Sequence, residues 1–134
     1  MIRNRTRGTT LCTAVEVASS PFQRALGLMF RSSLEGGMLF SFGRGAPAGM
    51  WTAGMRIPID ILWLDHDRRI IRIKERALPW RFMGGCTAWY VLELPAGTVQ
   101  KTRTRVGDLL SFAGEAAASR RATARSAPAR RGLR

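Results

Sequence analysis

The chain has 134 residues, of which 46% are hydrophobic and 23% are charged, so it fits one domain with a packed core and not two domains of ordinary size. No apolar run approaches the roughly 18 residues that a membrane-spanning helix needs. The basic N-terminus is not followed by an apolar segment of the kind that marks a secretory signal. Length and composition therefore exclude a membrane-spanning protein, and we expect the chain to be cytoplasmic.

The charge is strongly basic, since 22 Lys and Arg residues stand against nine Asp and Glu residues, for a net charge of +13. Part of this excess lies in residues 1–8, predicted to be a disordered basic arm. Another part lies in residues 114–134, predicted to be a disordered Arg- and Ala-rich tail because no large apolar residue occurs before Leu133. Nucleic-acid modules carry a recognisable motif or aromatic residues interleaved with basic ones, and neither pattern is present. The charge predicts at most nonspecific nucleic-acid binding.

The first half of the chain predicts short elements. Alternating side chains predict a strand over Thr9–Val17, with Leu11 and Val15 on one side. Ser20-Pro21 predicts the start of a helix that runs to about Leu28, because serine caps helices and proline suits their first turn. The apolar run 38–42 predicts a strand, the Gly- and Pro-rich run 43–49 a loop, and 50–56 an extended segment.

The second half contains the clearest strand, Ile59–Leu64. A polar turn over 65–68 and a returning strand over 69–76 predict a β-hairpin. On a strand, Ile59, Ile61 and Trp63 share one face, and Asp60, Leu62 and Leu64 the other. The remaining segments predict a loop over 77–87, a strand over 88–94, a helical turn over 96–101 and a last strand over 108–113.

Together these elements predict one domain over residues 9–113 with a mainly β (α+β) fold. The expected architecture is a small curved antiparallel sheet or a partly closed barrel with one or two short helices. No strand–helix–strand alternation typical of a parallel sheet occurs. A two-layer α+β sandwich is the alternative.

Six sequence motifs occur in a characteristic order: RALGLMFR (24–31), GGMLFSF (36–42), WTAGMRIPIDILWLD (51–65), ALPWR (77–81), VLELPAG (91–97) and VGDLL (106–110). Over about residues 10–113 the chain resembles domain-of-unknown-function family 192, a family of small bacterial and archaeal domains. Many members are similar to W-M-K-N-T-x-x-P-L-D in the third motif, where Gly54 and Met55 stand here in place of Asn and Thr. The chain thus looks like the branch with G-M-R-x-P-I-D. The resemblance implies no established activity.

Asp60 is the first candidate for a functional residue, because a carboxylate on a strand face of leucines must be paired, hydrogen-bonded or at the strand end. A structural ion pair with Arg56 or Arg24, a carboxylate facing a ligand, and an exposed carboxylate at the strand start all remain open. For Arg24, buried pairing and anion binding are the two interpretations.

Glu93 alternates with Val91 along its strand, which predicts a position on the sheet surface or at a barrel mouth. Trp51 and Trp80 either pack in the core or form an aromatic shelf for a ligand, over which the loop carrying Trp80 and Arg81 could close.

Two functions from different classes follow. The first is a non-catalytic binding module that holds a small polar or anionic ligand, or a protein segment, at a rim of Asp, Arg and Trp side chains. The alternative is a small hydrolase-like enzyme that uses Asp60 with a second carboxylate, Glu93 or Asp108. No cofactor or metal is predicted, because Cys12 and Cys86 lie far apart and His66 is the only histidine. The candidate ligand-binding residues are Arg24, Trp51, Arg56, Asp60, Trp80, Arg81 and Glu93.

Overall fold

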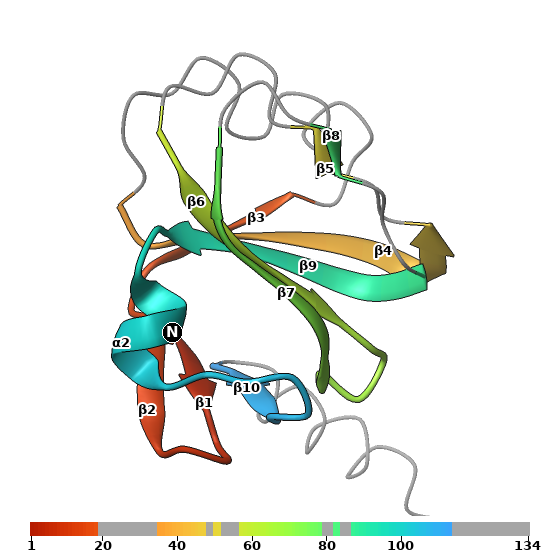
Figure 1. The fold of residues 1–134 in the computed structure, drawn as a ribbon. Helices are drawn as coiled ribbons and strands as arrows, with labels where there is room; N and C mark the ends of the chain where they lie inside the picture. Colours follow the sequence, from red (N-terminus) through yellow and green to blue (C-terminus); the bar gives the residue numbers. More distant parts are fainter. Residues whose placement is uncertain (19–34, 48–49, 52–56, 79–81, 84–86, 114–134) are drawn as a thin grey trace, which may run out of the picture.

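The computed structural model describes residues 1–18, 35–47, 50–51, 57–78, 82–83 and 87–113 (Figure 1). These residues form mostly strands with one short helix. In chain order the elements are β1 (Ile2–Asn4), β2 (Thr9–Cys12), β3 (Val15–Ala18), β4 (Gly37–Pro47), β5 (Met50–Trp51), β6 (Ile59–Leu64), β7 (Ile70–Ala77), β8 (Phe82–Met83), β9 (Thr87–Pro95), α2 (Thr98–Thr102) and β10 (Leu110–Phe112).

The central feature is a five-stranded sheet with strand order β3-β4-β9-β6-β7. Strands β3 and β4 pair in parallel, and every other neighbouring pair in this sheet is antiparallel. A three-stranded sheet, β10-β1-β2, lies below it in Figure 1, and β5 pairs with β8 above it. The mainly β prediction with a short helix is confirmed. The sheets stay open and do not close into a barrel.

Strand β6 lies inside the five-stranded sheet, between β9 and β7, and all six of its residues are buried. Its alternation divides the core into two faces, as the sequence predicts. The face turned away from the three-stranded sheet, here called the upper face, carries Ile59, Ile61 and Trp63, packed with Met38, Phe40, Ala77, Ala88 and Val91. The lower face carries Leu62 and Leu64, packed with Leu39, Leu92, Leu94 and, from the layer below, Ile2, Leu11, Val99, Leu110 and Phe112.

The prediction of a disordered N-terminal arm over residues 1–8 is wrong, because part of this segment is a paired strand. Strand β1 forms the middle of the three-stranded sheet, paired with β10 on one side and β2 on the other. Ile2 is 1% exposed and Asn4 is fully buried. Alternating arginines give this segment its hydrophilic composition, while Ile2 and Asn4 on either side of Arg3 point inward.

The strand predicted over Thr9–Val17 is two strands in different sheets. β2 ends at Cys12, and β3 begins at Val15 in the five-stranded sheet. Gly36 lies against this crossing with φ +86°, and a Cβ there would come within 2.4 Å of the carbonyl oxygen of Ala14. A side chain at Gly36 would push the crossing away from the start of β4.

The other predictions are mostly confirmed. The β6–β7 hairpin, β9, α2 and β10 occur within a few residues of their predicted places. β4 runs to Pro47, through most of the predicted loop 43–49, and β8 lies inside the predicted loop 77–87. The helix predicted over 20–28 and the tail from 114 lie outside the described residues. In the described part of the chain, no helix is long and apolar enough to cross a membrane.

Candidate functional site

Asp60 is fully buried on the lower face, where two backbone amides donate hydrogen bonds to its carboxyl oxygens. Its Oδ1 accepts a hydrogen bond of 2.9 Å from the N–H of Arg76, and its Oδ2 one of 2.9 Å from the N–H of Val99. Arg76 has φ +50°, so it bends the end of β7 toward the carboxylate. Asp60 therefore ties β6, β7 and α2 together. Arg24 and Arg56, the predicted ionic partners, lie outside the described residues.

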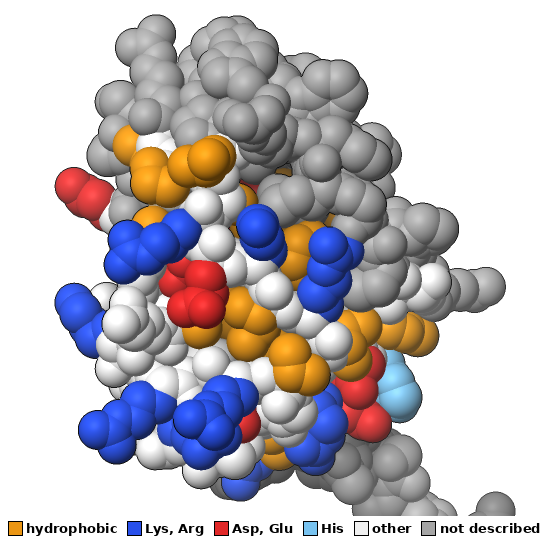
Figure 2. Space-filling view, viewed as in Figure 1, with side chains coloured by type: hydrophobic (Ala, Val, Ile, Leu, Met, Phe, Trp, Pro, Cys, Tyr) orange, Lys and Arg blue, Asp and Glu red, His pale blue; other side chains and the backbone are white. Residues whose placement is uncertain are grey.

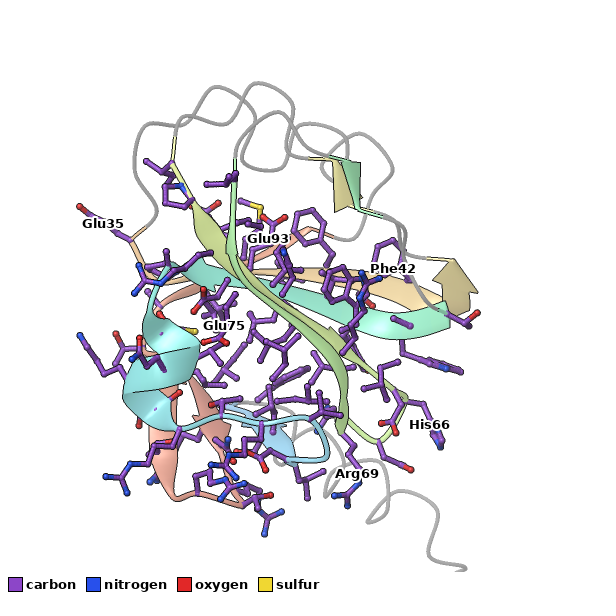
Figure 3. All side chains as sticks on the ribbon, viewed as in Figure 1. Glu35, Phe42, His66, Arg69, Glu75 and Glu93 are labelled. Carbon is purple, nitrogen blue, oxygen red and sulfur yellow. The ribbon has the colours of Figure 1, made fainter. Side chains whose placement is uncertain are left out.

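Glu93 is the buried carboxyl group of the upper face (Figure 3). It lies on β9 between β4 and β6, opposite Met38 on one side and Ile61 on the other. The residue is 4% exposed, and its Oε2 has no hydrogen-bond partner among the residues that the structure describes. Burial raises its pKa to about 8. The predicted surface or barrel-mouth position is wrong, because β9 is an inner strand and not an edge.

The two carboxyl groups do not share a cleft. Across the β6–β9 pair, Asp60 is opposite Leu94 and Ile61 is opposite Glu93. Since paired residues point to the same face and neighbours to opposite faces, Asp60 and Glu93 lie on opposite sides of the sheet. The pair of acids that a hydrolase would use is therefore not assembled from these two residues.

Asp108, the third candidate acid, lies apart from the other two, in the layer below the five-stranded sheet. It accepts hydrogen bonds from Asn4 Nδ2 at 2.9 Å, from Arg7 Nε at 3.1 Å and from the N–H of Arg105 at 2.9 Å. Burial acts to raise the pKa of this carboxyl, but these three bonds and the charge of Arg7 outweigh it and hold the pKa below its ordinary value. Asn4 also donates to Thr104 Oγ1 at 3.2 Å. The network fastens β1 to the segment between α2 and β10.

Sequence analysis missed Asn4 because it assigned residues 1–8 to a disordered arm. The alternation Ile2-Arg3-Asn4-Arg5 was the available signal, since it puts an apolar and an amide side chain on the face opposite two arginines.

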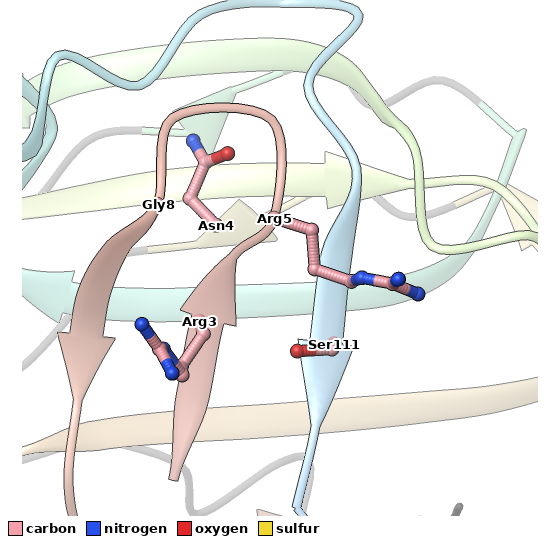
Figure 4. Close-up of a pocket in the computed structure, with 5 residues that line it drawn as sticks. All are labelled: Arg3, Asn4, Arg5, Gly8 and Ser111. Atoms are coloured by element: carbon pink, nitrogen blue, oxygen red, sulfur yellow. The ribbon is translucent and has the colours of Figure 1, made fainter.

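Two arginine-lined hollows open near this network. One has a volume of about 260 Å³ and is bordered by Arg3, Arg5 and Ser111, with Asn4 and Gly8 (Figure 4). The other, of about 570 Å³, is lined by Arg7, Glu75, Val99, Gln100, Arg103, Thr104 and Arg105. Figure 2 shows basic side chains on this lower part of the molecule and also across the middle of the face in view.

The remaining candidates are only partly described. Trp51 is part of β5, where its backbone pairs with Phe82. Trp80 and Arg81 lie outside the described residues, as does Cys86. Burial raises the pKa of the Cys12 thiol, which disfavours the reactive thiolate.

The turn at Asp65, His66 and Asp67 brings three potential metal ligands within 4.8 Å of one another. Asp65 Oδ1 instead accepts hydrogen bonds of 2.9 Å from the N–H groups of Asp67 and Arg69, which close the hairpin turn. The cluster therefore has a local structural role at the tip of the β6–β7 hairpin.

Comparison with known proteins identifies a family to which the chain is similar. The DUF192 family model, described as "Uncharacterized ACR", matches residues 2–112. A UPF0127 protein of Thermococcus sibiricus is 30% identical over 117 residues, covering 84% of this chain and 74% of that protein. A UPF0127 protein of Thermococcus gammatolerans is 32% identical over 115 residues, with the same coverage.

Two solved structures are similar in fold and sequence. One, from Sinorhizobium meliloti, is named a "putative transcription regulator"; it has a TM-score of 0.70 and 40% identity, over 75% of this chain and 81% of that one. The other, from Novosphingobium aromaticivorans, is named a protein of unknown function; it has a TM-score of 0.69 and 30% identity, over 73% of this chain and 74% of that one.

Proposed function

The chain belongs to the uncharacterised DUF192 family, and we propose that it is a non-catalytic binding module whose ligand contacts Glu93 on the upper face of the five-stranded sheet. The observation that carries this proposal is the Oε2 of Glu93, which is buried on an inner strand among apolar side chains and has no hydrogen-bond partner in the described part of the chain.

A buried polar atom without a partner is costly, and the great majority of such atoms in folded proteins are hydrogen-bonded. Glu93 faces Met38 and Ile61 across its two neighbouring strands, and neither side chain can supply a strong hydrogen bond. A bound group that supplies the missing bond would relieve this cost. Unsatisfied buried acids with a raised pKa are for this reason candidates for functional sites.

The protonation state of Glu93 indicates which chemical group the ligand would carry. With a pKa of about 8, Glu93 is mostly neutral at pH 7 and can donate one hydrogen bond. The ligand would therefore carry a hydrogen-bond acceptor, such as the carbonyl of an amide, beside an apolar group that packs on Met38 and Ile61. A peptide segment and a small polar molecule both meet this description.

Some of the rim residues predicted from the sequence are neighbours in the chain of described residues. Arg56 immediately precedes Ile57, which packs against the upper-face cluster. Trp51 is in β5, and Arg81 immediately precedes β8, the strand that pairs with β5. These residues stay candidates for the rim of the Glu93 site. Asp60 is no longer a candidate for this rim, because both of its carboxyl oxygens accept hydrogen bonds on the lower face.

Binding is better supported than the hydrolase alternative. A hydrolase of the predicted kind needs two carboxyl groups near one cleft. Asp60 and Asp108 are both buried and hydrogen-bonded away from the upper face, so neither is available as a second acid beside Glu93.

The test uses two small probes, N-methylacetamide as a hydrogen-bond acceptor and n-butylamine as a cation, titrated into the full chain and followed by NMR. We expect N-methylacetamide to shift resonances of Glu93, Met38 and Ile61 below the pKa of the acid, and the shifts to fade above pH 8 as the donor proton is lost. Glu93→Leu replaces the carboxyl group by an apolar side chain that suits the apolar surroundings, and it should abolish these shifts.

Asp67→Asn, which removes an exposed carboxylate in the turn between β6 and β7, is the matched control and should leave the shifts unchanged. Equal responses of the wild type and Glu93→Leu to N-methylacetamide, or no response in either, would count against a site at Glu93. A response to n-butylamine alone would reverse the assigned ligand chemistry.

A further inference from the structure

The lower end of the molecule carries a dense set of basic side chains, here called the basic pole. It is formed by alternate residues of two segments, the β1–β2 hairpin and the segment from α2 toward β10. Alternation directs these side chains outward while their neighbours Asn4, Thr102 and Thr104 are buried. The members of the basic pole are Arg3, Arg5, Arg7, Lys101, Arg103 and Arg105.

Little negative charge offsets the basic pole. Asp108 is 2% exposed, and its carboxylate already accepts hydrogen bonds from Asn4, Arg7 and Arg105. Glu75 lines the larger hollow, which it shares with three arginines. Among the described residues, Arg103 and Arg105 form no ion pair, so their guanidinium groups are available to an external anion.

The backbone that carries the basic pole is held in place, unlike the basic arm that the sequence predicts. Asp108 holds Arg7 through Nε, and the Arg7 side chain remains 36% exposed beside the larger hollow. The same carboxylate holds the backbone of Arg105, and the Asn4 side chain joins both to β1. A guanidinium group positioned in advance, as that of Arg7 is, loses less conformational entropy when it binds an anion.

We propose that the basic pole binds the phosphate backbone of double-helical DNA without reading its base sequence. Arginine forks match phosphate oxygens geometrically, and the two hollows give projecting phosphates a place between arginines. Neither hollow is lined by an aromatic side chain on which unpaired bases could stack, which favours a duplex over a single strand.

A membrane surface is the competing partner for a basic surface. Stable attachment to a bilayer needs an apolar face beside the cations. The linings of the two hollows are mostly polar and charged, and Val99 is the one large apolar residue among them. This composition favours DNA.

The test measures binding of the full chain to a fluorescent mixed-sequence DNA duplex over a range of salt concentrations. Two double variants, Arg3→Gln/Arg5→Gln and Arg103→Gln/Arg105→Gln, each remove two charges from one hollow. Lys74→Gln/Arg76→Gln removes two charges from exposed positions on β7 and is the matched control. Thermal melts of each variant check that it is folded.

We expect each basic-pole variant to bind DNA on the order of tenfold more weakly at low salt. Each should also lower the slope of log K against log salt by about 2, because it neutralises about two fewer phosphates. The control should change both quantities much less, and a duplex of a second sequence should bind equally well.

Equal losses in all three variants would mean that only net charge matters, and unchanged binding would mean that another part of the chain carries it. Either result overturns the proposal, and so does a preference for one duplex sequence. Binding to phosphatidylcholine–phosphatidylserine vesicles that depends on the basic pole, with no binding to DNA, would replace DNA by a membrane.

Discussion

Asp60 and Glu93 are both carboxyl groups on inner strands, and they differ in the backbone that reaches them. A bend at Arg76 and the first turn of α2 bring two N–H groups to Asp60. At Glu93 the backbone N–H groups of β4 and β6 are engaged in the sheet, and its side chain faces Met38 and Ile61. The sequence predicts which face Asp60 occupies, but not which residues from α2 and β7 arrive there.

Glu93 should make the protein less stable as the pH rises. Its pKa is about 4.5 when unperturbed and about 8 in the fold, so between these values the folded state binds more protons than the unfolded state. The free energy of unfolding then falls with pH, by about 3 kcal/mol between pH 5 and pH 8 if the full shift is expressed. Urea denaturation across this range should give that slope for the wild type and a nearly flat profile for Glu93→Gln. A wild-type profile as flat as that of the variant would mean that Glu93 is ionised in the fold.

Asp60→Asn should destabilise the protein by about 3 kcal/mol, because the amide nitrogen of Asn is a donor and would face the N–H group of Arg76 or of Val99 in place of an acceptor oxygen. Denaturation at pH 7 measures the change. Asp67→Asn provides the comparison, since the Asp67 side chain is 70% exposed and surface changes usually stay within about 0.5 kcal/mol. Similar small losses in both variants would show that the bonds from Arg76 and Val99 contribute little.

At the scale of elements, the sequence predicts strands whose pattern is local and misses those that depend on distant partners. Ile59–Leu64 and its returning strand have clear alternation and a polar turn between them, so the hairpin could be predicted. β1 has three residues, and its pairing partner β10 lies more than a hundred residues along the chain. The inner position of β9, which buries Glu93, likewise depends on pairing with β4 and β6.

Ile2→Ala should distinguish a packed strand from a disordered arm. In the structure Ile2 is 1% exposed and belongs to the lower-face core, so truncation should cost about 2–5 kcal/mol in the free energy of unfolding. Arg5→Ala, at an exposed position in the same hairpin, should cost much less. Chemical denaturation of the two variants measures the difference. If Ile2→Ala were as stable as the wild type, β1 would not be part of the cooperative fold.

For the whole molecule, the two faces of the five-stranded sheet have different neighbours. The three-stranded sheet and α2 cover the lower face, where leucines and Asp60 are enclosed. The upper face contains Trp63 and Glu93, whose Oε2 has no hydrogen-bond partner among the described residues. The carboxyl group whose two oxygens are both hydrogen-bonded, Asp60, thus lies below the sheet, and Glu93 lies above it, at a distance from the basic pole.

The last prediction concerns residues 115–134, which we expect to be dispensable for folding. The family match ends at residue 112, and β10 ends at Phe112. Beyond it the sequence offers no large apolar residue before Leu133, so it has little surface to bury. The deleted segment contains six Arg and one Glu, and its loss lowers the net charge from +13 to +8. Deletion should shift the melting temperature by no more than about one or two degrees, since surface changes cost little. A scan of the shortened and full chains at equal salt tests this, and a large drop or a loss of cooperative melting would mean that the tail packs against the domain.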